Sequence, residues 1–190
     1  MRAFIAIEIP QEIKGFLAAL QKGLRRSNAD ISWVKPHNIH VTMRFLGEIE
    51  LLQQNAITKI LDTVSKRHSS FKLRLSSLGA FPNAKSPRVI WVGIDLGTEQ
   101  LQKIAGELET ALQGSGFSPE ERPFTSHMTI GRTKSSLNRS LLVKIMENVN
   151  QRFEEEKPEM IVSKITLFKS TLTPGGPVYE ALYIANLITT

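Results

Sequence analysis

The feature that most constrains this chain is the alternating stretch Asn38–Phe45. Residues two apart in a β-strand point to the same face. One face of the strand predicted here carries Asn38, His40, Thr42 and Arg44. The other face carries Ile39, Val41, Met43 and Phe45. A face of that polarity is costly to bury in a core without partners, so we predict that it lines a polar cleft.

A second copy of the pattern lies at Thr125–Ile130. Both stretches contain a histidine followed two residues later by a threonine, as His40 and Thr42 and as His127 and Thr129. On a strand, each pair places an imidazole and a hydroxyl side by side, roughly 6 to 7 Å apart. A single His-x-Thr is most often structural, but two copies on strands in similar surroundings favour a shared functional role.

The hydrophobic pattern divides the chain into two halves with the same order: strand, helix, motif strand, helix, strand. The predicted strands cover about 2–9, 38–46, 71–75, 88–94, 125–132, 159–168 and 178–187, and the predicted helices about 13–24, 50–66, 98–114 and 138–150. We therefore predict an α+β fold as one domain, residues 1–190, with two pseudo-symmetric lobes around a central cleft. This pattern does not assign the last strand to either sheet.

The composition restricts which cellular compartment and which binding partners are expected. The 24 basic and 18 acidic residues give a net charge of +6, which fits an anionic partner such as nucleic acid and fits an ordinary soluble surface equally well. The absence of cysteine excludes disulfides, a thiol nucleophile and thiolate-bound zinc, and it agrees with a reducing cytoplasm. The apolar run before Pro10 is too short to span a bilayer, so we predict a buried strand and no membrane partner.

The residue types favour acid-base chemistry on a phosphodiester. Histidine exchanges protons near neutrality, so one of His40 and His127 can activate water while the other protonates a leaving oxygen. The hydroxyls of Thr42 and Thr129 are candidate donors to phosphoryl oxygens.

Three further side chains are candidates for substrate contacts. Arg44 and Arg132 offer positive charge, with a lobe-to-lobe ion pair as the alternative role for Arg44. Phe45, like Trp33 and Trp91, can stack on a base, although strand alternation turns Phe45 away from His40.

Metal and cofactor binding are poorly supported. No carboxylate lies two residues from either motif histidine, and His37 and His40 fall on opposite strand faces. The chain has no P-loop, no G-x-G-x-x-G and no G-x-S-x-G motif. We therefore predict no metal and no cofactor.

Beyond these residues, the chain resembles the two-histidine phosphoesterase superfamily and, within it, the RNA 2′,3′-cyclic phosphodiesterase or 2′-5′ RNA ligase family. The most specific block is Trp33–Glu48. The other matching segments are Arg2–Ala6, Pro87–Trp91, Pro123–Arg132, Leu167–Ser170 and Pro174–Tyr179. The resemblance runs nearly end to end.

The resemblance implies that each of the two lobes is an antiparallel sheet with helices on its outer face, around a central cleft. It also implies hydrolysis of RNA 2′,3′-cyclic phosphate ends to 2′-phosphate ends without a metal. It implies that His40 donates a proton to the leaving 3′ oxygen and that His127 is the base that activates water; the sequence alone does not separate these roles. Thr42 and Thr129 carry over as phosphate ligands. The family name implies 2′-5′ ligation as the reverse reaction, which the cell need not use.

The resemblance also implies a role for Arg132, five residues after His127. Simple alternation would turn Arg132 away from His127, and a bulge at Gly131 would restore its direction. The expected partner is RNA, with tRNA fragments as one candidate, and the protein is expected to be a cytoplasmic monomer. Two alternatives stay open: a phosphoesterase acting on a small cyclic-phosphate nucleotide, and a non-catalytic RNA-binding module.

Overall fold

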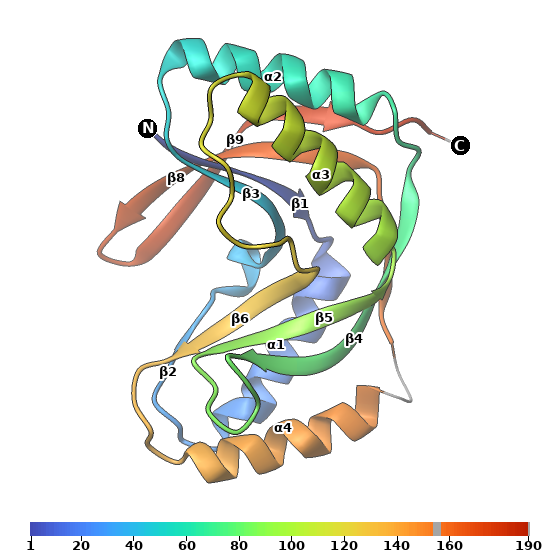
Figure 1. The fold of residues 1–190 in the computed structure, drawn as a ribbon. Helices are drawn as coiled ribbons and strands as arrows, with labels where there is room; N and C mark the ends of the chain where they lie inside the picture. Colours follow the sequence, from blue (N-terminus) through green and yellow to red (C-terminus); the bar gives the residue numbers. More distant parts are fainter. Residues whose placement is uncertain (154–156, 190) are drawn as a thin grey trace.

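The computed structural model describes residues 1–153 and 157–189, which form two antiparallel sheets and four α-helices (Figure 1). The strands are β1 (Arg2–Glu8), β2 (Ile31–Trp33), β3 (His40–Glu48), β4 (Phe71–Phe81), β5 (Val89–Leu96), β6 (His127–Thr133), β7 (Glu159–Val162), β8 (Lys164–Thr173) and β9 (Gly176–Asn186). The helices are α1 (Gln11–Arg25), α2 (Leu51–Ser65), α3 (Thr98–Gly114) and α4 (Arg139–Phe153), with a 3-10 turn, η1 (Pro36–Asn38). The predicted α+β class is confirmed.

Each sheet draws strands from both halves of the sequence. The four-stranded sheet has the order β3-β1-β8-β9, and the five-stranded sheet has the order β2-β6-β5-β4-β7. Each motif strand pairs with the first strand of its own half, β3 with β1 and β6 with β5. The third strand of each half crosses over, so that β4 pairs with β5 and β8 pairs with β1. The lobes therefore do not coincide with the sequence halves that the repeated order suggests.

The strand predicted at 159–168 is two strands in different sheets. β7 pairs with β4, and β8 lies between β1 and β9. The buried positions change parity at the break, from Met160 and Val162 before Ser163 to Ile165 and Leu167 after it. A one-residue shift in the alternation exchanges the two faces of a strand, so the chain changes sheets here. The short strand β2, which pairs with β6, was not predicted.

A single large core lies between the sheets and the helices. Ile5 of β1, Val41 of β3 and Val92 of β5 are fully buried in it together with helix residues such as Leu61 and Leu108. Burying a side chain of this size contributes about 1.5–3 kcal/mol. The other face of β1 and β8 carries a separate small cluster of Phe4, Ala6 and Phe168, with Tyr179 packed against it. The two faces of the sheet are thus chemically different.

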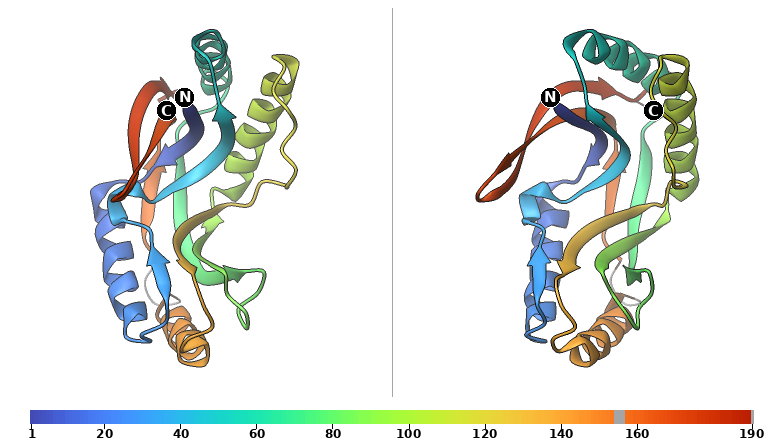
Figure 2. Two further views of the ribbon diagram at one scale, coloured as in Figure 1. Left: turned by 90° about the vertical axis from the view of Figure 1, so that its left-hand side faces the viewer. Right: turned by 60° about the vertical axis from the view of Figure 1, so that its left-hand side comes forward.

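The helices form two pairs at opposite ends of the molecule (Figures 1 and 2). α2 packs along α3 and contacts β8 and β9, while α4 packs against α1 and contacts β4. This arrangement covers the core face of each sheet. Within residues 1–153 and 157–189, no helix is both long and apolar enough to cross a membrane.

Candidate active site

Both motif histidines are held in the same way at the first residue of their strands. The Nδ1 of His40 lies 2.8 Å from the carbonyl oxygen of Asn38, and the Nδ1 of His127 lies 2.7 Å from that of Thr125. A carbonyl oxygen only accepts, so each Nδ1 carries a proton and donates it to the backbone. This bond fixes the ring orientation and reserves Nε2 for proton exchange.

The two imidazoles lie close enough to interact electrostatically. Burial lowers the pKa of His40 most strongly, and a positive charge on His127 lowers it further. The hydrogen bond to Asn38 opposes this shift because it favours the charged ring. The fold therefore brings together the two histidines, which lie 87 positions apart in the sequence, by placing β3 beside β6.

The threonines follow the histidines on the same strand faces, as the alternation predicts. Thr42 lies opposite Ala6 of β1, and Thr129 lies opposite Trp91 of β5. Both threonines are half-buried. We call His40, Thr42, His127 and Thr129 the two-histidine site.

A β-bulge in β6 determines where Arg132 points. Trp91 pairs with Thr129 and Ile90 pairs with Gly131, so Ile130 is an extra residue that reverses the alternation. Ile130 and Gly131 are accordingly both buried. Arg132 then lies opposite Val89, on the face of His127. Burial raises the pKa of the Tyr179 hydroxyl, and the positive charges of Arg2 and of Arg132 oppose this rise.

The bulge residue is Ile130, one position before the glycine to which the sequence pattern attributes it. The backbone of Gly131 serves a packing purpose instead. A Cβ at this position would lie 2.9 Å from Ile31 and 3.1 Å from the ring of Trp33, so the glycine allows β2 to approach β6.

The same irregularity occurs at the equivalent place in β3. Thr42 pairs with Ala6 and Arg44 pairs with Ile5, so Met43 is the extra residue, three positions after His40, as Ile130 is three positions after His127. Phe45 consequently lies opposite Phe4.

The bulge at Met43 brings Phe45 to the histidine face. The ring of Phe4 lies 4.8 Å from the ring of His40 and 6.2 Å from the ring of Phe45. Phe45 is 57% exposed there. The expectation that Phe45 points away from His40 is therefore wrong, because alternation is interrupted between them.

Arg44 is engaged by carboxylates of the second half of the chain. Its guanidinium lies 2.7 Å from Glu109 of α3 and 2.8 Å from Glu120, and it donates to the carbonyl of Ser118. The side chain is only 10% exposed. The structure places Arg44 in ion pairs that tie β3 to α3 and to the segment that follows α3.

Comparison with known proteins agrees with this geometry. The family model described as LigT like Phosphoesterase matches residues 7–91 and 94–179, one segment in each half. The chain belongs to the LigT-like phosphoesterase family. A relative from Aeropyrum pernix, named RNA 2′,3′-cyclic phosphodiesterase, is 36% identical over 169 residues, which is 89% of this chain and 93% of the relative. A relative of the same name from Thermotoga maritima is 34% identical over 183 residues, 96% of this chain and 94% of the relative.

Solved structures share the LigT-like fold. A crystal structure of a protein from Thermus thermophilus matches with a TM-score of 0.78 and 25% identity, covering 98% of both chains. The apo crystal structure of LigT from E. coli matches with a TM-score of 0.76 and 24% identity, covering 98% of this chain and 97% of LigT. The fold is thus that of the LigT-like family along nearly the whole chain.

Aromatic side chains surround both histidines of this LigT-like protein, and of these the sequence had marked only Trp91, as a candidate for stacking on a base. His40 contacts Phe4 and, at 5.5 Å between ring centroids, Tyr179. His127 contacts Phe81 at 5.3 Å and Trp91 at 6.3 Å. Phe4 and Tyr179 come from the two ends of the chain, so no local pattern around His40 could have indicated them.

Trp91 lies flat against the backbone of β4. A Cβ at Gly79 would lie 2.1 Å from its ring, so this glycine makes room for the indole beside His127. Among the described residues, no three His, Cys, Asp or Glu side chains are grouped as metal ligands would be.

Proposed function

We propose that this protein hydrolyses RNA 2′,3′-cyclic phosphate ends to 2′-phosphate ends by acid-base catalysis between His40 and His127, with no metal. The observation that carries the proposal is the pair of imidazoles, each tethered through Nδ1 and within electrostatic reach of the other. The names of the A. pernix and T. maritima relatives supply the substrate class.

In the proposed reaction, Nε2 of His127 takes a proton from water as the water oxygen attacks phosphorus. The bond from phosphorus to the 3′ oxygen breaks, and Nε2 of His40 gives its proton to that oxygen. The hydroxyls of Thr42 and Thr129 donate to the non-bridging oxygens, and Arg132 adds positive charge. The product carries the phosphate on the 2′ oxygen, and both histidines return to their starting states by proton exchange with water.

The lowered pKa of His40 has a direct place in this scheme. In the protein without substrate, the lowered pKa favours the neutral His40 ring. The ring is shielded from water by burial, and a positive charge on His127 lies nearby. An approaching cyclic phosphate carries a negative charge, which favours the protonated ring. Substrate binding thereby prepares His40 as the proton donor.

The remaining site residues have separate proposed roles. Arg44 holds two carboxylates, which supports a role in joining β3 to α3 in place of phosphate binding. The exposed ring of Phe45, next to Phe4, offers an apolar surface for the terminal base. We further propose a cytoplasmic monomer that acts on RNA, with tRNA fragments as a candidate substrate and 2′-5′ ligation as the reverse reaction.

The test is incubation of the protein with an oligoribonucleotide that ends in a 2′,3′-cyclic phosphate, in the presence of EDTA. The expected product is a 2′-phosphate, identified by chromatography against synthetic 2′- and 3′-phosphate standards. His40→Ala and His127→Ala are each expected to lower kcat by roughly a hundred- to ten-thousand-fold. His68→Ala is the matched control, because His68 pairs with Glu107 on another surface. A 3′-phosphate product, or an unreacted end, would refute the proposal.

A further inference from the structure

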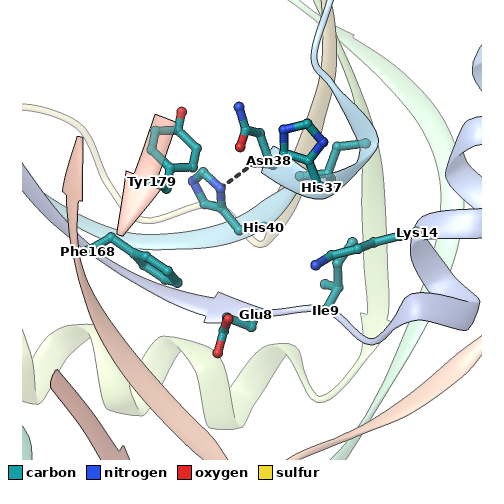
Figure 3. A pocket seen from close by; sticks show the side chains of 9 residues that line it. Glu8, Ile9, Lys14, His37, Asn38, His40, Phe168 and Tyr179 are labelled. Carbon is teal, nitrogen blue, oxygen red and sulfur yellow. Dashed lines mark hydrogen bonds between the residues drawn. The ribbon is translucent and has the colours of Figure 1, made fainter. Parts of the chain in front are cut away.

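A pocket of about 150 Å³ lies on one flank of His40 (Figure 3). Its walls come from the ends of β1 and β3, from the first turn of α1, from η1, and from Phe168 and Tyr179. His40 is the only member of the two-histidine site that lines it. The pocket is therefore next to the proposed chemistry and separate from the space between the histidines.

The charges around this pocket favour an anion. Lys14 extends its ammonium group toward the pocket, and His37 lies at the rim beside Asn38. Within residues 1–153 and 157–189, neither the Lys14 nor the His37 side chain has an ion-pair or hydrogen-bond partner. Two potential cationic donors in one pocket without a partner suit a phosphate group.

The one acidic residue of the pocket is already neutralised. A carboxylate oxygen of Glu8 lies 2.8 Å from the ammonium of Lys164 and 3.3 Å from the hydroxyl of Thr166. The negative charge of Glu8 is thus compensated from β8, and the charge of Lys14 is left over.

We propose that this pocket binds the phosphate on the 5′ side of the terminal nucleotide, with Lys14 and His37 as its ligands. The inference rests on the proposed function, in which His40 protonates the 3′ oxygen. In the sugar, the path to the 5′ phosphate from the 3′ oxygen is one carbon shorter than the path from the 2′ oxygen. The 5′ phosphate is thus covalently nearer to the oxygen that His40 protonates, and this pocket is the one that flanks His40.

The size of the pocket agrees with this ligand. Sites for whole drug-sized ligands occupy about 300–1,000 Å³, whereas this pocket has about half the lower limit. It suits a phosphate group with ordered water, while the base and sugar lie outside it. Such a site would make the enzyme prefer an RNA chain, or a 5′-phosphorylated nucleotide, over a nucleoside cyclic phosphate with a free 5′ hydroxyl.

The experiment compares three substrates that differ only on the 5′ side: a nucleoside 2′,3′-cyclic phosphate with a 5′ hydroxyl, the same compound with a 5′ phosphate, and a trinucleotide with the same cyclic end. We expect the native protein to have a lower KM for the second and third substrates. Lys14→Met and His37→Gln should each raise KM for those two substrates about tenfold more than for the first. With the trinucleotide, Lys14→Met should also reduce the slope of log(1/KM) against log salt by roughly 0.7.

Lys22→Met is the matched control, because Lys22 is an exposed residue on the same helix and its loss changes the net charge equally. Calorimetry with the product, a nucleoside 2′-phosphate with and without a 5′ phosphate, gives a reading that does not need turnover. We expect the 5′ phosphate to tighten binding to the native protein, and Lys14→Met to remove most of that gain. Equal effects of Lys14→Met on all ligands, or no preference of the native protein for a 5′ phosphate, would overturn the pocket assignment.

These outcomes separate the two proposals. Turnover of the 5′-hydroxyl substrate with no discrimination at the 5′ side would leave the reaction standing and remove the subsite. Selective binding of 5′-phosphorylated nucleotides that depends on Lys14, without any turnover, would support the subsite and remove the proposed reaction.

Discussion

At the residue scale, His40 and His127 share a backbone tether and differ in their surroundings. Both donate Nδ1–H to the carbonyl two residues earlier. His40 is enclosed by Phe4 and Tyr179, and burial is the main reason that its pKa is lowered. Two chemically alike motifs can therefore take different proton-transfer roles because their aromatic neighbours differ.

The lowered pKa of His40 predicts a pH dependence of stability. The unfolded chain, in which histidine titrates near about 6.5, binds this proton more readily than the folded protein does. Stability from His40 is thus fully present above about pH 6.5 and is lost as the pH falls from there to the lower folded-state pKa. Urea unfolding between pH 7.5 and 5 should show a smaller loss of stability in His40→Gln than in the native protein. Equal losses would contradict the assignment.

The same shift is directly measurable by NMR titration of the His40 ring. We expect a midpoint below the ordinary value of about 6.5. The midpoint should rise in His127→Ala, because a nearby positive charge has been removed, and it should rise on addition of inorganic phosphate. A titration midpoint that stays the same in both experiments would mean that the two rings do not interact.

The ion pairs of Arg44 predict a loss of stability when this side chain is removed. Arg44→Ala would leave Glu109 and Glu120 without their partner at a site where Arg44 is 10% exposed. We expect the free energy of unfolding to fall by about 2 kcal/mol. Arg67→Ala is the control, since its pair with Glu107 is exposed and should contribute less than about 1 kcal/mol. Similar values for the two variants in urea unfolding would argue against a structural tie at Arg44.

At the scale of the secondary-structure element, the two motif strands share an irregularity. Each has a bulge three residues after its histidine, at Met43 and at Ile130. In both strands the bulge brings the residue five positions after the histidine onto the histidine face, Phe45 in β3 and Arg132 in β6. One half of the site thereby gains an aromatic ring, and the other gains a cation.

The bulge in β6 is held from outside by α1. The side-chain amide of Gln21 donates to the carbonyl of Ile130 at 2.8 Å and to that of Val34 at 2.7 Å. Gln21 is 3% exposed. The buried glutamine in an apolar helix face is thus explained, because its amide donates hydrogen bonds to carbonyl groups at and near the bulge.

Gln21→Leu should loosen this bulge. We expect a loss of about 1–3 kcal/mol in unfolding free energy, because the Val34 carbonyl loses the Gln21 donor and the Ile130 carbonyl keeps only the Val34 N–H. We also expect KM for a cyclic-phosphate substrate to rise by a larger factor than kcat falls, since Arg132, the proposed phosphate contact, would lose its fixed direction. Gln102→Leu, on the exposed face of α3, is the control and should change stability by less than about 0.5 kcal/mol. An unchanged KM in Gln21→Leu would show that Arg132 does not depend on the bulge.

At the scale of the whole molecule, the exchange of strands joins the two halves. β4 of the first half completes the sheet of β5 and β6, and β8 from the end of the chain completes the sheet of β1 and β3. The two sheets and the helices that cover them therefore share one core. Neither half has a complete sheet of its own.

This topology predicts a single cooperative unfolding transition. Trp33 and Trp91 report on the five-stranded sheet, whereas far-UV circular dichroism reports on both sheets and all helices. We expect the urea curves from tryptophan fluorescence and from circular dichroism to coincide. Two separated transitions would show that the lobes unfold independently in spite of the shared core.

The sequence by itself determined the helices, most of the strands and the two His-x-Thr pairs of the site. The spacing of apolar residues located the helices and most strands, and the two His-x-Thr pairs placed an imidazole beside a hydroxyl on each motif strand. These features are local, because they depend only on the period of a strand or helix. The directions of Phe45 and Arg132, by contrast, follow from bulges, which exist only relative to a neighbouring strand.

The tertiary structure alone decided what surrounds the histidines. Strand pairing put β8 and β9, from the end of the chain, on the far side of β1 from β3, which set Phe4 and Tyr179 against His40. Contacts between residues so far apart depend on sheet order, and a periodic pattern carries no information about sheet order. The alternating stretch at His40 thus specified a polar strand face, and its pairing with β1, across from β6, made that face one side of a two-histidine site.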